Sequence, residues 1–509
     1  MKSFLRRFLF YLILLCGPIL IWVVLEILLH LMNDRFRPLA VDHQKKTLHI
    51  NQNYFNDFFL YDVPGFYVTS SSNRAIHLEK NSIFRIFCIG ESTIAGYPFN
   101  TFPQLECPSS FPNYLRAILQ YNKKVPTIEV LNAGCNALGS FQVLRVFKDL
   151  LRYKPDLVIV YSGHNEFFGP NEFILPKEKA FLYQNQTLNG FFLFLRRTYS
   201  YQVVKWAIGF LPKKLQTKPQ DYADWSVKNN ISFDDPIHAS IRINYRRNLT
   251  ELVRLAKTNG IQVILCAPVS NWTFPPFISK NAPSITKEGR AQWASRMQLA
   301  DTTYKQGKYA EALDIWQKLK DVDSTFADLY FQRGKGYTKL SDYQAAAYEL
   351  WRAKDFDQMP FRAKSFISMI CRDVARENGI ILADMEQYFI NLSDRYLPHP
   401  NLFIDHVHPT DEGNYYLALY LAQLIIENRL FPNVEKIEYP EHKKCRSALK
   451  IDEAILDNIE VDLTKISYME SLSKLNPEIK EFLARIKNQA LIRIAEKRDK
   501  WIKESKESR

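Results

Sequence analysis

Short runs of apolar residues alternate with amphipathic segments through much of the chain. The apolar runs lie at residues 83–89, 127–132, 156–161, 261–267 and 380–384. Apolar residues at helical spacing fill segments between them, at 110–121, 138–153, 239–258 and 361–378. Continuous apolar strands separated by helices are typical of a parallel sheet that is covered on both faces. The pattern therefore predicts an α/β fold with three layers, in which functional residues lie where strands end and helices begin.

The N-terminal segment differs from the rest of the chain in being almost entirely apolar. Residues 8–32 contain only two ionisable side chains, Glu26 and His30. At ~1.5 Å per residue, a helix of this length crosses a hydrocarbon layer of ~30 Å. Basic residues precede the segment, which favours an N-terminus in the cytoplasm. We therefore expect a single transmembrane helix, with the rest of the chain outside the cytoplasm, either in the periplasm or at the cell surface.

Changes of pattern divide the chain into parts. They are a membrane anchor at 1–35, a stalk and outer layer at 36–82, the α/β domain at 83–285 and 359–435, a helical insertion at 286–358, and a charged helical region at 436–509. A second insertion, at 167–237, combines large apolar residues with Arg and Lys. Three interpretations of it remain open: a helix in a membrane interface, a lid over the site, or an ordinary buried helix.

The helical insertion contains an internal repeat. Tyr309 and Tyr343 are 34 residues apart, and so are Ala312 and Ala346. This period, with aromatic and small residues at fixed offsets, resembles the tetratricopeptide repeat, a helix-turn-helix unit. Two units are fewer than a free-standing array needs, so we expect the pair to pack against the α/β domain. It is either a surface for a protein partner or a rigid structural insertion.

Composition excludes several classes of function. Lys and Arg number 67 against 54 Asp and Glu, a formal net charge of +13, but the excess is spread along the chain, so nucleic acid is not an expected partner. The seven cysteines form no CxxC pair, and a single bridge between Cys107 and Cys135 is left open. The sequence lacks HExxH, a Walker glycine loop, and GxGxxG after a strand. We therefore expect neither a metal nor another cofactor.

Four short motifs follow predicted strands or lie near the end of the α/β pattern. They are Gly90-Glu91-Ser92-Thr93, Asn132-Ala133-Gly134, Gly163-His164-Asn165-Glu166 and Asp405-His406-Val407-His408-Pro409. In this order and context they resemble the SGNH hydrolase superfamily, also called the GDSL esterase/lipase group. The resemblance covers roughly residues 83–166, 239–270 and 361–427, and it implies a flavodoxin-like three-layer domain with ester-cleaving activity.

The chemistry of ester cleavage explains why these residue types are needed. The Ser92 hydroxyl is a weak nucleophile until a neighbouring base takes its proton. His408 is the candidate base, and Asp405, three residues earlier, is the candidate group that orients its imidazole. An oxyanion hole requires preorganised donors, which the backbone N–H groups of Ser92 and Gly134 and the side-chain amide of Asn165 can supply.

Alternatives and departures accompany this assignment. His164 and His406 remain alternative bases, although the Asp-x-x-His spacing favours His408. Glu91 and Glu166 stand where the family often has Asp, so both positions keep a carboxylate that can accept hydrogen bonds.

Three further residues are candidates for contact with substrate. Ser270 and Asn271 follow the fourth predicted strand, where they either line the cleft or form a turn. Arg362 lies where the helical insertion returns to the α/β domain, and it either binds an anionic substrate group or pairs with a carboxylate.

The sequence thus predicts a membrane-anchored serine hydrolase that cleaves acyl esters on envelope glycans or lipids through an acyl-enzyme at Ser92. An O-acyltransferase that passes the acyl group to a sugar hydroxyl needs the same residues, so the sequence does not separate the two. A non-catalytic envelope scaffold, in which the repeat pair recruits a protein partner, is the alternative outside enzymology.

Overall fold

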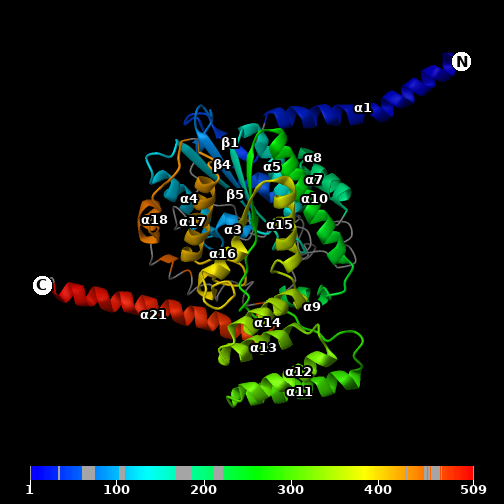
Figure 1. The fold of residues 1–509 in the computed structure, drawn as a ribbon. Helices are drawn as coiled ribbons and strands as arrows, with labels where there is room; N and C mark the ends of the chain where they lie inside the picture. The colour runs from blue at the N-terminus through cyan, green and yellow to red at the C-terminus, as the bar shows by residue number, and fades with distance from the viewer. Residues whose placement is uncertain are drawn as a thin grey trace.

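A parallel sheet forms the centre of the structure (Figure 1). The computed structural model describes residues 2–32, 35–59, 75–101, 109–167, 185–209, 222–431, 433–451 and 473–507, together with 455, 456, 459 and 471. Within this part of the chain, the sheet has five strands in the order β5-β4-β6-β7-β8, and every neighbouring pair is parallel. The strands are β4 (Phe84–Gly90), β5 (Ile128–Gly134), β6 (Leu157–Tyr161), β7 (Gln262–Ala267) and β8 (Ile381–Asp384). Their carboxyl ends therefore meet at one edge of the sheet.

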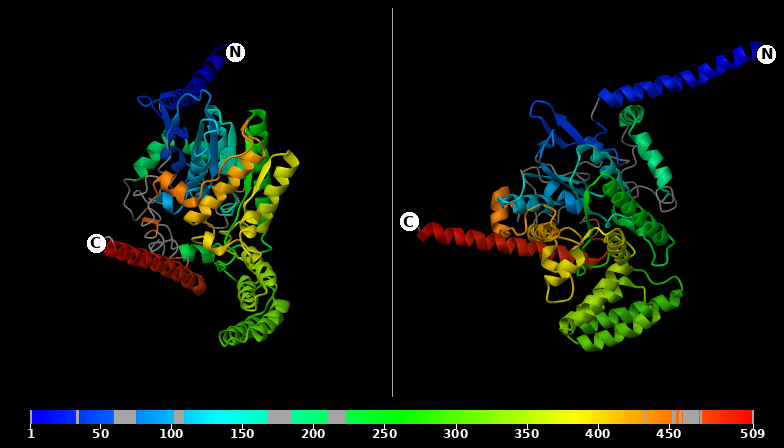
Figure 2. Two further views of the ribbon diagram at one scale, coloured as in Figure 1. Left: turned by 60° about the vertical axis from the view of Figure 1, so that its left-hand side comes forward. Right: turned by 45° about the horizontal axis from the view of Figure 1, so that its top comes forward.

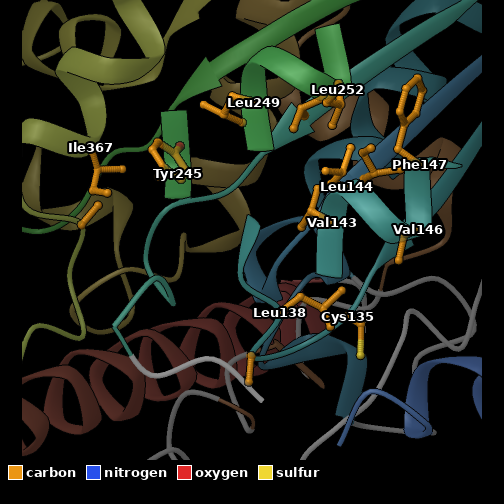
Figure 3. Close-up of a cluster of buried hydrophobic side chains, with 14 of the residues drawn as sticks. Cys135, Leu138, Val143, Leu144, Val146, Phe147, Tyr245, Leu249, Leu252 and Ile367 are labelled. Carbon is orange, nitrogen blue, oxygen red and sulfur yellow. The ribbon is translucent and has the colours of Figure 1, made fainter. Parts of the chain in front are cut away.

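Helices cover both faces of this sheet. The first face carries α4 (Phe111–Gln120) and α17 (Asp411–Glu427), and the second carries α5 (Ser140–Leu150), α10 (Ile237–Thr258) and α15 (Ser365–Asn378). Side chains alternate along each strand, so Ile86 of β4 packs on the first layer and Phe87 packs on the second. Figure 3 shows part of the second layer, where Val143 and Phe147 of α5 lie near Leu252 of α10. The predicted α/β fold with a covered parallel sheet is confirmed.

A small antiparallel sheet covers the amino ends of the central strands. It consists of β1 (Leu39–Asp42), β2 (Thr47–Ile50) and β3 (Ile76–His77), and α2 (Gln52–Asn56) follows β2. Leu39, Leu48 and Ile76 belong to the same buried cluster as α5 and α10. Arg85 of β4 donates to Glu129 of β5 at 2.8 Å and also to the carbonyl of His77. The described part of the predicted stalk is thus packed against the main domain.

Four helices form the insertion at the end of the molecule that lies farthest from α1 (Figures 1 and 2). They are α11 (Lys287–Lys305), α12 (Tyr309–Val322), α13 (Ala327–Lys339) and α14 (Tyr343–Phe356). Tyr309 begins α12 and Tyr343 begins α14, so the repeat in the sequence coincides with the spacing of the helices. The kinship of these helices with tetratricopeptide repeats stays a prediction.

The N-terminal helix α1 (Lys2–Met32) leads away from the body of the molecule (Figures 1 and 2). Over the residues that the structure describes, we find no helix that is both long enough and apolar enough to cross a membrane. The side chains of residues 2–15 and 31 lie outside that description, so the membrane anchor stays a prediction. The described parts of the second insertion form α7 (Gln186–Arg196), α8 (Tyr199–Gly209) and α9 (Tyr222–Lys228).

The C-terminal region contributes α18 (His442–Leu449) and the long helix α21 (Pro477–Glu507), while α16 (Met385–Asn391) follows β8. Apolar side chains in the first turns of α21, those of Ile479, Phe482 and Leu483, are buried, and the ring of Phe482 lies 4.8 Å from that of Phe274. Glu478 pairs with Lys335 of α13 at 2.6 Å. The beginning of α21 therefore lies between the α/β domain and the helical insertion, and the rest of it projects from the body (Figure 1).

Candidate active site

Ser92 lies at the carboxyl end of the central strand β4. It is the first residue of the short helix α3 (Ser92–Ala95). Gly96 ends this helix with a φ of 88°, a left-handed conformation that favours glycine, and its N–H donates to the Ser92 carbonyl at 2.9 Å. The tight strand-turn-helix connection leaves the Ser92 side chain partly exposed at the edge of the sheet.

The structure brings Ser92, His408 and Asp405 into one hydrogen-bonded row. The Ser92 Oγ lies 2.8 Å from His408 Nε2, and His408 Nδ1 lies 2.6 Å from Asp405 Oδ2. The other carboxylate oxygen, Oδ1, accepts the backbone N–H groups of Val407 and His408, both at 2.8 Å. A carboxylate on the Nδ1 side holds the proton there, so the Nε2 lone pair faces the serine hydroxyl.

Electrostatics keep the acid of this row ionised. Burial by itself raises the pKa of Asp405, but the interaction with the His408 imidazole and the hydrogen bonds from the side chain and backbone of His408 outweigh it. The pKa of Asp405 consequently lies well below its ordinary value. A carboxylate that stays charged at neutral pH can stabilise the imidazolium that forms when His408 takes a proton.

The two alternative bases occupy other positions. His406 is buried beside the rings of Phe274 and Phe277, and burial lowers its pKa to about 3. His164 is buried as well, and its Nδ1 accepts the backbone N–H of Ala363 at 3.1 Å. Burial holds the pKa of His164 well below its usual range. Both rings are therefore neutral at physiological pH, and the imidazole that contacts Ser92 is that of His408.

Two of the three expected oxyanion donors are engaged elsewhere. The Gly134 N–H donates to the side-chain oxygen of Asn132 at 3.0 Å. The Asn165 amide donates to Glu91 Oε2 at 2.9 Å and to the Leu138 carbonyl at 3.2 Å, which occupies both of its hydrogens. In this geometry both groups already donate to acceptors within the protein, which differs from the expectation for Gly134 and Asn165.

The Ser92 N–H remains a candidate oxyanion donor, because the first N–H groups of a helix have no acceptor within it. Gly134 has a packing role instead. A Cβ at this position would lie 2.6 Å from Ile94 Cγ2 and would collide with the backbone nitrogen of Ala95. The glycine therefore lets α3, and with it Ser92, lie directly against β5.

The two glutamates next to the motif residues connect the loops around the site. Glu91 is fully buried and accepts the N–H groups of Gly163 and His164 in addition to the Asn165 amide. These bonds tie the turn after β4 to the turn after β6. Burial, followed by the charge of Glu166, raises the pKa of Glu91 well above its usual value.

Glu166 binds the start of α5. Its carboxylate accepts both the N–H and the hydroxyl of Ser140, each at 2.7 Å. Burial raises the pKa of Glu166 to about 7. The glutamates thus act as acceptors within the protein, as their carboxylates suggest.

Arg362 does not bind substrate in this structure. Its side chain is buried, pairs with Asp357 at 3.3 Å, and donates to the carbonyls of Asn271 at 3.1 Å and Phe274 at 2.7 Å. A buried guanidinium with a carboxylate and two carbonyls as partners is a structural ion pair. The substrate-binding interpretation of Arg362 is therefore wrong, and the alternative of a paired carboxylate holds.

Asn271 supports the loop that carries the base and the acid. Its side-chain amide donates to the Asp405 carbonyl at 3.2 Å, and its backbone N–H donates to the His406 carbonyl at 2.9 Å. Asn271 is fully buried, and its side-chain oxygen accepts the N–H of Thr273 at 3.0 Å, so it forms a turn, which is the alternative to lining the cleft. Ser270 is almost fully buried. Because Arg362 holds the carbonyl of Asn271, these contacts connect the return of the helical insertion with the Asp405–His408 loop.

Sequence reasoning missed one aromatic contact with the base. The ring of Tyr97 lies 4.6 Å from the His408 imidazole, at an interplanar angle of 50°. Tyr97 is close to Ser92 in sequence, but its type belongs to none of the motifs, so only the folded chain reveals it.

Across the described ranges there is no group of three or more His, Cys, Asp and Glu side chains that could hold a metal ion. Cys135 is a buried free thiol, whereas Cys107 lies outside the described residues.

Comparison with known protein families finds a match over part of the chain. Residues 88–334 match the model of the GDSL-like Lipase/Acylhydrolase family. The match contains Ser92 and ends before the loop of Asp405 and His408, which the structure places against the serine. No curated protein matches the chain in sequence.

Solved structures similar to this chain include a lipolytic protein and an esterase. A putative lipolytic protein of the G-D-S-L family from Desulfitobacterium hafniense is 13% identical, with 67% of this chain and 98% of that chain covered and a TM-score of 0.29. An acetyl xylan esterase from Geobacillus stearothermophilus is 13% identical, with 70% and 97% covered and a TM-score of 0.30. The assignment rests on the family match and the geometry around Ser92, and by both the domain is an ester-cleaving serine hydrolase.

Proposed function

We propose that this chain, which carries a domain of the GDSL-like lipase/acylhydrolase family, is a membrane-anchored esterase that removes acyl groups from envelope glycans or lipids. The observation that carries the catalytic part is the row Ser92 Oγ, His408 Nε2 and Asp405 Oδ2, with distances of 2.8 and 2.6 Å. The apolar N-terminal segment supports anchoring, and the basic residues before it support a catalytic domain outside the cytoplasm.

The reaction begins with the transfer of the Ser92 proton. His408 Nε2 accepts this proton while Ser92 Oγ forms a bond to the ester carbonyl carbon, and the carbonyl oxygen becomes negative. Asp405 stabilises the positive imidazolium, and the Ser92 N–H donates to the oxyanion. The Nε2 proton then moves to the ester oxygen, the alcohol leaves, and the acyl group stays on Ser92.

Water completes the cycle by the same route in reverse. His408 takes a proton from water, the hydroxide oxygen attacks the acyl-enzyme, and Ser92 regains its proton as the carboxylic acid departs. If a sugar hydroxyl replaces water in this step, the same residues perform an acyl transfer. The acceptor therefore decides between a hydrolase and an O-acyltransferase.

The experiment combines a fluorophosphonate probe with p-nitrophenyl acetate hydrolysis by the full chain in detergent. Ser92→Ala and His408→Ala are compared with Ser393→Ala, which removes a serine hydroxyl from an exposed loop. We expect labelling to require Ser92 and turnover to fall by about 10³-fold or more in both site variants. Labelling with negligible turnover in water would favour the transferase, and no labelling of a folded protein would favour the scaffold.

A further inference from the structure

The described part of α1 is apolar on every side. Between residues 19 and 29, all side chains except Glu26 are apolar and exposed. Consecutive positions of a helix point in all directions around its axis, so no single protein surface can cover them. A helix of this kind needs an apolar surrounding on all sides, which a lipid bilayer supplies.

A second apolar surface lies on the hairpin of α7 and α8, at the end of the molecule from which α1 emerges (Figure 1). Its exposed large side chains are Phe191, Phe192, Phe194, Val203, Val204 and Trp206. Phe194 is 61% exposed and Trp206 is 67% exposed, values that are unusual for side chains of this size. Aromatic residues on a short helix favour the boundary between lipid headgroups and acyl chains.

Glu26 joins these two surfaces. Its carboxylate accepts the N–H groups of Tyr199 and Ser200, both at 2.8 Å, and the Ser200 hydroxyl at 2.6 Å. The side chain thus caps the positive N-terminal end of α8. Trp22 Nε1 donates to the same hydroxyl at 2.6 Å. The one acidic residue of the apolar segment therefore has hydrogen-bond partners, and these offset the free-energy cost of placing a carboxylate beside lipid.

The opposite side of the hairpin is attached to the α/β domain. Arg196 donates to the Phe58 carbonyl at 3.1 Å, and Arg197 pairs with Asp149 at 2.9 Å. Both arginines are buried, so they hold the hairpin on the domain and are not directed at lipid headgroups. The exposed apolar side chains of the hairpin therefore do not pack on the domain.

We infer that the α7–α8 hairpin lies in the surface layer of a lipid bilayer, held beside α1 by Glu26, and fixes the orientation of the catalytic domain on the membrane. A bilayer explains both apolar surfaces together, whereas a protein partner of the hairpin leaves α1 uncovered. The inference rests on the membrane anchoring in the proposed function, because α1 has to be in lipid for the hairpin beside it to reach the bilayer.

The test measures where single residues lie, using nitroxide labels on the full chain in phosphatidylcholine and phosphatidylglycerol nanodiscs. The background carries Cys16→Ser, because Cys16 is exposed, and Cys107→Ser, because that residue lies outside the described part. Labels are placed by Phe194→Cys and Trp206→Cys on the hairpin. Hydrolysis of p-nitrophenyl acetate at the rate of the unlabelled protein verifies that each labelled chain is folded.

Two further labels serve as controls. Leu20→Cys reports on α1, where the native side chain is 65% exposed, and Met369→Cys reports on α15, where it is 58% exposed on the domain. We expect labels at 194 and 206 to collide with oxygen as the label at 20 does. Their collisions with a polar nickel chelate should fall roughly tenfold below those at 369, because polar solutes are excluded from apolar surroundings.

The controls distinguish the placement of the hairpin in the bilayer from the membrane anchoring by α1. If the label at 20 lies in lipid while those at 194 and 206 behave like that at 369, the hairpin inference is overturned and the anchor stands. If the label at 20 is also in water, the anchoring part of the proposed function fails with it.

A second variant tests the contact between the helices. Glu26→Leu makes α1 more apolar, so the anchor should remain in lipid while the cap of α8 is lost. We expect the label at 206 to move toward water, with more collisions with the nickel chelate. An unchanged label at 206 would overturn the role of Glu26 in holding the hairpin.

Discussion

Asp405→Asn isolates the electrostatic part of the catalytic row with little change of shape. The Asn oxygen can keep accepting the N–H groups of Val407 and His408, which Asp405 Oδ1 accepts at 2.8 Å. The amide nitrogen then replaces Oδ2, which lies 2.6 Å from His408 Nδ1. An amide donates where the carboxylate accepted, so the imidazole has to carry its proton on Nε2. That nitrogen is the one that must accept the proton of Ser92.

The expected magnitude follows from this change of tautomer. Loss of the acid from a serine triad lowers kcat by about 10⁴-fold, or roughly 5 kcal/mol of barrier at 1.36 kcal/mol per factor of ten. Stability should change less, by about 1 kcal/mol, since the two backbone hydrogen bonds to Oδ1 are kept. Asp405→Ala removes those bonds too, so it should cost a further 1–3 kcal/mol or so of unfolding free energy.

The assay compares kcat and KM for p-nitrophenyl acetate with the unfolding free energy in urea. Asp384→Asn is the matched control, because Asp384 also accepts a backbone N–H, that of Gln387 at 3.1 Å. It pairs with Arg372 and lies outside the row, so kcat should stay near the wild-type value. If Asp405→Asn retained kcat within about tenfold of wild type, the assignment of Asp405 as the acid of the triad would be wrong.

Three further predictions concern the surroundings of the site. Arg362→Leu leaves Asp357 buried without its partner and should lower the unfolding free energy by about 3–5 kcal/mol in urea titrations; a loss below about 1 kcal/mol would contradict the buried pair. Gly134→Ala places a Cβ against Ile94 and should cost about 1–3 kcal/mol in the same assay and lower kcat as α3 shifts, so unchanged values of both would refute the packing argument. The pKa of Glu166 is raised by burial from 4.5 to about 7, so its stabilising effect is present below pH 4.5 and is lost as the pH rises through 7. Glu166→Gln should remove this loss, at most about 3 kcal/mol, and equal pH dependence of unfolding in both proteins would disprove it.

The apolar runs determined the sheet. A strand that is covered by helices on both faces has to be apolar at successive positions, as β4 is. Such a strand can therefore be predicted without knowing which elements pack on it. The motif residues also predicted the site at Ser92. The carboxyl ends of parallel strands meet at one edge of the sheet, regardless of the length of the segments that connect the strands. His408 came from a late loop, but its spacing from Asp405 is local and was visible.

The partners of polar side chains were decided only by the tertiary structure. Arg362 looked available for a substrate anion, but Asp357 and the carbonyl of Asn271 enclose it. The Asn165 amide is held by Glu91, 74 positions earlier in the chain. A hydrogen bond depends on which groups the fold brings within about 3 Å, and this follows from the packing of distant segments.

The same distinction applies to the apolar N-terminal segment. The sequence by itself determined that one segment is apolar enough to seek lipid, because hydropathy is a sum over neighbouring residues. It left Glu26 unexplained, since the N–H groups that this carboxylate accepts belong to Tyr199 and Ser200 on another helix. Apolar patterns are local properties of a chain, whereas the satisfaction of a buried polar group is a property of its surroundings, and only the folded structure supplies those.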